Sequence, residues 1–290
     1  MRHLFSLVCL MVIATVFPAS AQERLKVVAS FSILGDLVRN VGGTSVSVTT
    51  LVGPDSDAHV YSPTPADAKK LADARLIFIN GLGFEGWLPR LVKSAGSKAA
   101  VVTATSGIAP LKLGSDADPH AWQSVANAKI YVGNIRDALA AADPASAAAF
   151  RANAETYLAK LDALDREVRE AVARIPEGHR KVISTHAAFG YFAAAYGVAF
   201  IAPVGVSTES EPSARDIAGI ITQIRVAKIP AVFLENVSDA RLIRRISAET
   251  GARVGGTLYS DSLTGEKGDS PTYIDMVRHK IKALTSALAN

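Results

Sequence analysis

The chain has 290 residues, and its 31 lysines and arginines against 27 aspartates and glutamates give a net charge of only +4. Basic residues do not cluster with aromatic ones, which argues against nucleic-acid binding. The single cysteine, Cys9, lies in the apolar N-terminal segment, so the rest of the chain has neither disulfides nor thiolate metal ligands. The length suits two domains of ordinary size.

Residues 1–21 have the pattern of a secretory signal peptide. Arg2 supplies the positive charge, residues 4–17 are apolar, and Ala19-Ser20-Ala21 is a small-residue cleavage site. No other run approaches the roughly 18 apolar residues that a spanning helix needs. We therefore expect an exported protein without a membrane span.

Strands and helices alternate along the first half of the chain. Residues 25–30, 46–52, 75–80 and 99–103 read as buried strands, and helical patterns lie between them and over 125–141. This alternation predicts a parallel sheet with helices on both faces. The first α/β lobe is expected to cover residues 22–142.

Two histidines of this half follow the ends of predicted elements. His59 lies in the loop that comes after the second strand. His120 follows Pro119, which restricts Asp118 to extended geometry, so His120 is expected to leave a turn rather than a helix interior.

Residues 143–175 change character and predict one long helix. Asp143 is a suitable N-cap and Pro144 suits the first helical position. Apolar residues then recur at alternating steps of four and three, which keeps them on one face. About 32 residues span roughly 48 Å. A two-helix hairpin or a coiled-coil seam is the alternative, but a rod that joins two domains is favoured because a new strand–helix series follows.

That second series is expected to form another α/β lobe over residues 176–290. Strands are predicted at 181–184, 198–201, 231–234 and 253–258, with helices at 213–228 and 273–288 among them. His186 lies where the first of these strands passes into a helix, and Asp261 follows the last strand. Two similar lobes joined by one helix leave a cleft between them, which is a natural ligand site.

Four polar side chains are therefore predicted at element ends, two from each lobe. Ligands bind at the carboxyl ends of strands in open α/β sheets. Three imidazoles and a carboxylate suit Zn²⁺ in tetrahedral geometry. Their spacing carries no local signature, however, and each residue taken alone is more often an ordinary structural one. His179 and His279 are interpreted as surface residues. The candidate ligands are His59, His120, His186 and Asp261.

Motifs along the whole chain resemble the metal-binding solute-binding proteins of ABC transporters, the cluster A-I or cluster 9 family. The resemblance implies two α/β lobes, a linking helix, capture of a divalent metal in the periplasm, delivery to an ABC transporter permease in the inner membrane, and a monomer. The motifs are Asp57-Ala58-His59 with Ser62-Pro63-Thr64-Pro65-Ala66-Asp67, Asn80-Gly81-Leu82-Gly83-Phe84-Glu85-Gly86-Trp87, Asp118-Pro119-His120-Ala121-Trp122, His186-Ala187-Ala188-Phe189-Gly190-Tyr191-Phe192 and Ser260-Asp261-Ser262-Leu263.

The resemblance favours zinc, because the third ligand position holds His186, whereas it is often glutamate in manganese proteins of the family. A manganese or iron carrier is the alternative. Residues 205–213 and Tyr259-Ser260-Asp261 look like the AztC-type zinc branch, which implies a periplasmic zinc chaperone as a further partner. Two departures are notable: residues 111–117 form no histidine-rich loop, and Ala58 replaces a frequent proline.

A secreted zinc hydrolase is a second class of function that the residues leave open. Three histidines and a water form a catalytic zinc site when a carboxylate such as Asp261 acts as the base. The chain has no His-Glu-x-x-His helix, no Gly-x-Ser-x-Gly elbow and no Walker phosphate loop. We therefore expect a binding protein and not an enzyme.

Overall fold

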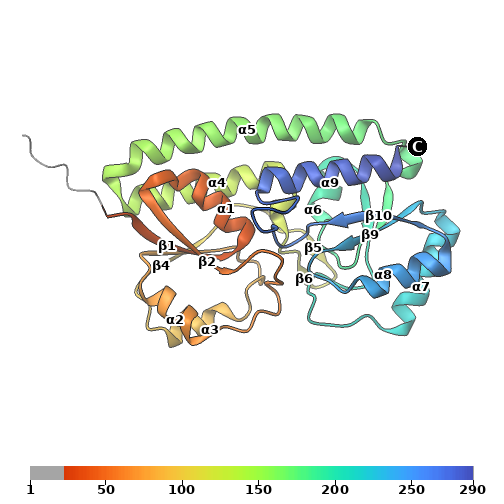
Figure 1. Cartoon of the computed structure of the whole chain (residues 1–290), viewed down its shortest axis with the longest axis horizontal. Helices are drawn as coiled ribbons and strands as arrows, with labels where there is room; N and C mark the ends of the chain where they lie inside the picture. Colours follow the sequence, from red (N-terminus) through yellow and green to blue (C-terminus); the bar gives the residue numbers. More distant parts are fainter. Residues whose placement is uncertain (1–22, 290) are drawn as a thin grey trace, which may run out of the picture.

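The computed structural model describes residues 23–289, which form two α/β halves side by side beneath a layer of long helices (Figure 1). The predicted signal peptide, residues 1–21, lies outside the described residues. Across residues 23–289, no helix combines the length and hydropathy that a bilayer crossing requires. The predicted α/β class with two parallel sheets is confirmed.

The N-terminal half contains a parallel sheet in the order β2-β1-β3-β4. Successive residues of β1 point to opposite faces of this sheet. Val27 packs with α1 and α4, whereas Val28 packs with α2 and α3. The elements are β1 (Leu25–Phe31), α1 (Ser32–Gly42), β2 (Val46–Val52), α2 (Pro65–Ala72), β3 (Leu76–Ile79), α3 (Leu88–Ser94), β4 (Ala100–Thr103) and α4 (Val125–Ala142).

The C-terminal half repeats this arrangement with a parallel sheet in the order β10-β9-β7-β8. Helices α7 and α8 cover one face, where Ile183 and Val232 are buried. Helix α9 covers the other face, against Phe233. The elements are β7 (Lys181–Ile183), α6 (Gly190–Tyr196), β8 (Ala199–Ile201), α7 (Ala214–Ala227), β9 (Ala231–Glu235), α8 (Ala240–Thr250), β10 (Arg253–Leu258) and α9 (Tyr273–Leu288).

The long helix α5 (Ala147–Ala173) carries the chain from one half to the other and extends along both (Figure 1). Its 27 residues correspond to about 40 Å. The predicted apolar stripe is buried from Phe150 to Val168. The helix begins later than predicted, because Asp143 caps a separate 3₁₀ turn at Pro144–Ser146.

Helix α5 is not a free-standing rod, because α4 packs beneath it in the N-terminal half and α9 in the C-terminal half. Contacts at the start of α9 join the two halves: the Tyr273 backbone N–H donates to Asp36 of α1 at 2.9 Å, and the Tyr273 hydroxyl donates to the Trp122 carbonyl at 2.7 Å. The halves therefore share one apolar core. The lobe limits 22–142, 143–175 and 176–290 stay predictions.

A small antiparallel hairpin follows β4 and was not predicted. It consists of β5 (Lys112–Leu113) and β6 (Asp116–Ala117). The Leu111 backbone N–H donates to the Tyr191 hydroxyl of α6 at 3.0 Å, and that hydroxyl donates to the Asp118 carbonyl at 3.0 Å. The hairpin thus fixes the segment that leads to His120 against the C-terminal half.

Candidate metal centre

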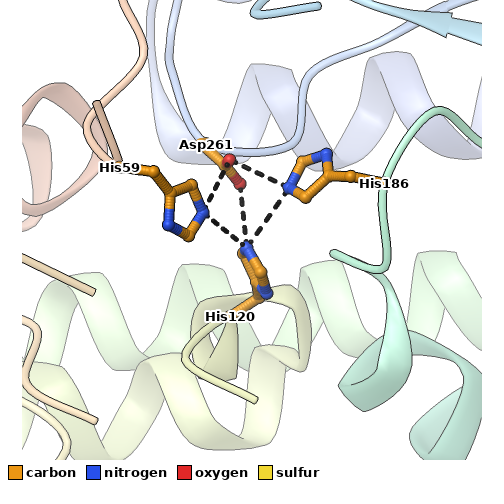
Figure 2. A group of neighbouring side chains, drawn as sticks. All are labelled: His59, His120, His186 and Asp261. Atoms are coloured by element: carbon orange, nitrogen blue, oxygen red, sulfur yellow. Dashed lines mark hydrogen bonds and ion pairs between the residues drawn. The ribbon is translucent and has the colours of Figure 1, made fainter. Parts of the chain in front are cut away.

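The four predicted ligands meet at one point between the two halves (Figure 2). His59 comes from the loop after β2, and His120 begins a 3₁₀ turn at Ala121–Gln123. His186 and Asp261 follow the ends of β7 and β10. All four side chains are buried, and their candidate ligand atoms lie within 4.8 Å of one another.

The separations between these atoms have the size of a tetrahedral site. The Nε2 atom of His120 lies 3.3 Å from that of His59 and 3.4 Å from that of His186. The carboxylate oxygens of Asp261 lie 3.4, 3.5 and 3.1 Å from the Nε2 atoms of His59, His120 and His186. Ligands at 2.0–2.2 Å from a tetrahedral metal ion stand about 3.3–3.6 Å apart. The arrangement therefore fits a small divalent cation.

The chemistry of the donor set also fits a cation. Both oxygens of Asp261 are buried, yet they accept no hydrogen bond of ordinary geometry from the described residues. A buried carboxylate without such partners is costly. A divalent ion among the three imidazole nitrogens would give this carboxylate the partner that it lacks.

Carboxylates orient two of the three imidazoles. Asp118 Oδ1 lies 2.7 Å from His120 Nδ1 and also accepts the His120 backbone N–H at 2.9 Å. Glu235 Oε2 lies 2.6 Å from His186 Nδ1, as an ion-pair contact rather than a hydrogen bond of ordinary geometry. A proton held on Nδ1 by a carboxylate leaves the Nε2 lone pair free for a metal ion. Both rings thus present Nε2 to the shared point.

Glu235, the last residue of β9, also fixes the backbone at His186. Its Oε1 atom accepts the backbone N–H groups of Thr185 at 2.7 Å and of His186 at 3.0 Å. The sequence prediction ended this strand at residue 234 and missed Glu235. A glutamate that directly continues an apolar strand was the signal that could have found it.

His59 is held by contacts from both halves. Its backbone N–H donates to Asp57 Oδ1 at 2.8 Å, and Asp57 Oδ2 accepts the Thr208 hydroxyl of the other half at 2.6 Å. The His59 ring stands edge-on to Phe84, with centroids 4.7 Å apart. His59 is 7% exposed, whereas the other three candidate ligands are 0% exposed. It is therefore the side of the cluster nearest to solvent.

A surface groove reaches the cluster at His59. Its walls include Phe84 and Gly86 from one half and Val206, Ser207 and Glu209 from the other. Glu209 is exposed on the wall of this groove. His179 and His279 are half-buried rather than at the open surface, and they contact the Leu288 and Thr257 carbonyls at 3.0 and 3.1 Å.

The charges of the cluster are strongly coupled. Burial alone lowers the pKa of His186, but the carboxylates of Glu235 and Asp261 outweigh it and raise this pKa well above its usual value. Burial similarly raises the pKa of Asp261, yet His186 and His120 hold it well below the usual range. For His120, burial wins and lowers the pKa. The carboxylates of Glu235 and Asp261 therefore favour a proton on His186, and a metal ion competes with that proton for the ring.

The comparisons with known proteins agree with this geometry. The family model ZnuA, described as zinc-uptake complex component A, periplasmic, matches residues 27–287. The iron-binding protein YfeA of Yersinia pestis is 37% identical over 272 residues, which cover 92% of this chain and 87% of that protein. The manganese-binding lipoprotein MntA of Halalkalibacterium halodurans is 35% identical over 268 residues, covering 92% and 89%.

Solved structures share the whole architecture. The periplasmic zinc-binding protein TroA of Treponema pallidum superimposes with a TM-score of 0.88 at 30% identity, covering 92% of this chain and all of that one. The Mn-bound periplasmic metal-binding protein from Candidatus Liberibacter asiaticus gives a TM-score of 0.83 at 32% identity, covering 91% of this chain and 98% of that one. The chain belongs to the ZnuA family of metal-binding solute-binding proteins and is a metal-binding component of an ABC importer, not an enzyme.

Proposed function

We propose that this protein binds Zn²⁺ through His59, His120, His186 and Asp261 and delivers it, in the periplasm, to an ABC transporter permease in the inner membrane. The observation that carries the proposal is the convergence of three Nε2 atoms and one carboxylate at separations of 3.1–3.5 Å. Zinc accepts imidazole and carboxylate ligands in such a closed tetrahedral site, which leaves no open position for catalysis. A zinc chaperone and a monomeric state stay predictions.

The choice of zinc follows from ligand chemistry. Imidazole suits zinc better than it suits manganese, which prefers carboxylate, carbonyl and water oxygens. The site offers three nitrogens, and three of its four ligands are completely buried. Water ligands that would complete an octahedron therefore have little access.

A manganese or iron carrier is the second candidate, and two observations favour it. Relatives are named for manganese and for iron. Both oxygens of Asp261 also face the imidazole nitrogens, Oδ1 toward His120 and Oδ2 toward His59 and His186. A carboxylate that binds through both oxygens would raise the coordination number above four.

A competition experiment separates these candidates. Metal is removed from the protein with a chelator, the protein is incubated with equimolar Zn²⁺ and Mn²⁺, and the bound metal is identified by native mass spectrometry. We expect one Zn²⁺ per chain. Preferential uptake of Mn²⁺ would refute the zinc assignment and support the alternative.

The ligand assignment is tested with His186→Ala and the control His179→Ala, a histidine outside the cluster. We expect His186→Ala to weaken Zn²⁺ binding by at least about 100-fold, since even residues that only orient a ligand contribute 10–100-fold. His179→Ala should leave the affinity unchanged. Equal affinities in both variants would remove His186 from the site.

A further inference from the structure

Lys280 is a fully buried lysine that forms no ion pair within the described residues. It lies on α9 with 0% exposure, and its Nζ atom donates to the side-chain oxygen of Gln123. The rings of Phe189 and Phe192 stand 5.3 and 4.9 Å from Nζ. Burial lowers the pKa of Lys280 to about 7. An apolar residue would be less costly here, so the amino group needs a specific explanation.

Gln123 connects this lysine to the metal cluster. Its side-chain nitrogen donates to the Ser260 carbonyl at 2.7 Å, and the indole N–H of Trp122 donates to the same carbonyl at 2.9 Å. Gln123 ends the 3₁₀ turn that His120 begins, and Ser260 directly precedes Asp261. One side-chain amide therefore joins a ligand segment of the N-terminal half to a ligand segment of the C-terminal half.

The orientation of that amide depends on Lys280. An amide that is free to turn presents either its oxygen or its nitrogen to the Ser260 carbonyl, and only the nitrogen can donate. An amino group next to the oxygen selects the productive orientation. Both the charged and the neutral amino group carry N–H donors, so this selection survives a change in protonation.

We propose that Lys280 is a positioning residue for the metal site: it orients Gln123 so that Gln123 holds the Ser260 carbonyl, and with it the Asp261 carboxylate, against the turn that carries His120. The inference rests on the proposed function, because it matters only if His120 and Asp261 share one ion. Lys280 itself touches none of the four ligands through an ion pair or hydrogen bond in the described structure.

The first test is Lys280→Met, which keeps the length of the side chain and removes the donor. The matched control is Lys282→Met, two residues further along α9 and exposed. We expect Lys280→Met to bind Zn²⁺ about 10–100-fold more weakly, as for other residues that orient metal ligands. The melting temperature of its metal-free form is measured separately, because the variant removes a buried amino group but also leaves the Gln123 oxygen without its donor. A merely structural role would lower the melting temperature and leave the affinity unchanged.

Gln123→Met and the double variant complete a thermodynamic cycle, with Zn²⁺ affinity as the readout. If Lys280 acts through Gln123, both single variants lose Zn²⁺ affinity. The double variant then binds Zn²⁺ no more weakly than the single variant with the larger loss. Independent losses that multiply would overturn the inference, as would Zn²⁺ affinity within twofold of wild type in either single variant. If Lys280→Met does not fold, Gln123→Met alone decides. A wild-type chain that binds neither Zn²⁺ nor Mn²⁺ overturns the proposed function instead.

Discussion

Replacing Glu235 with glutamine tests whether the carboxylate behind His186 sets the ligand's tautomer. The substitution keeps the size of the side chain and removes its charge. In the wild type, the backbone N–H groups of Thr185 and His186 donate to Oε1 of the carboxylate at 2.7 and 3.0 Å, and the ring nitrogen Nδ1 of His186 lies 2.6 Å from Oε2 as an ion-pair contact. A glutamine has one accepting oxygen in place of two.

Either orientation of the new amide creates a conflict. If its oxygen stays on the two backbone N–H groups, its NH₂ group faces His186 Nδ1, and the ring proton must move to Nε2, where it blocks the metal. If the amide turns, its NH₂ group faces two backbone donors. We therefore expect Glu235→Gln to weaken Zn²⁺ binding about 10–100-fold, which corresponds to about 1.4–2.8 kcal/mol.

The affinity is measured at pH 8.5 by competition with a chelating indicator. The high pH matters because Glu235 also raises the pKa of His186, so its loss at lower pH would relieve proton competition and hide part of the effect. Glu209→Gln, an exposed carboxylate beside the groove, is the control and should change the affinity less than twofold. Nitrogen NMR of the imidazole reports the tautomer directly. A Glu235→Gln affinity within twofold of wild type would refute the reasoning.

Two further predictions concern protons. Glu235 and Asp261 outweigh burial and raise the pKa of His186, so the metal competes with a proton for this ring. Calorimetry in buffers of different ionisation enthalpy should therefore show proton release on Zn²⁺ binding that decreases as the pH rises. The affinity for Zn²⁺ should fall with falling pH. Burial lowers the pKa of Lys280 to about 7, so between about pH 7 and pH 10 the unfolded chain binds more protons than the folded one. The free energy of unfolding of the metal-free wild type, measured by urea titration, should therefore rise with pH across this window. A Lys280→Met variant that shows the same rise would exclude Lys280 as its source.

The sequence predicted that the four candidate ligands lie close together, because residues that follow parallel strands can lie only at the carboxyl edge of the sheet. Parallel strands bring their carboxyl ends to one edge, so His186 and Asp261 had to lie at the same edge once β7 and β10 were recognised. Likewise, the repeat of apolar residues from Phe150 to Val168 predicted the buried stripe of α5 without knowledge of its partners.

The residues that support the candidate ligands were not predicted from the sequence, because their roles depend on contacts between distant parts of the chain. Lys280 lies four residues from Met276 and from Leu284, on the buried stripe of α9, where a charged side chain is rarely fully buried. Glu235 contacts a residue 49 positions away. Local propensity predicts neither such partner nor the β5–β6 hairpin, which α6 fixes from the other half of the molecule.

The helical layer limits how the molecule can exchange its ion. One apolar core passes beneath α5 and α9 from half to half, and further contacts near the cluster, such as the Asp55 backbone N–H to the Leu263 carbonyl at 2.9 Å, tie the halves together. A wide swing of one half away from the other would expose this core to water, at a cost of about 25 cal/mol for each Å² of apolar surface. Entry and exit are then left to small displacements of the loops around His59, and the radius of gyration in solution scattering should be nearly the same for the loaded and the empty protein.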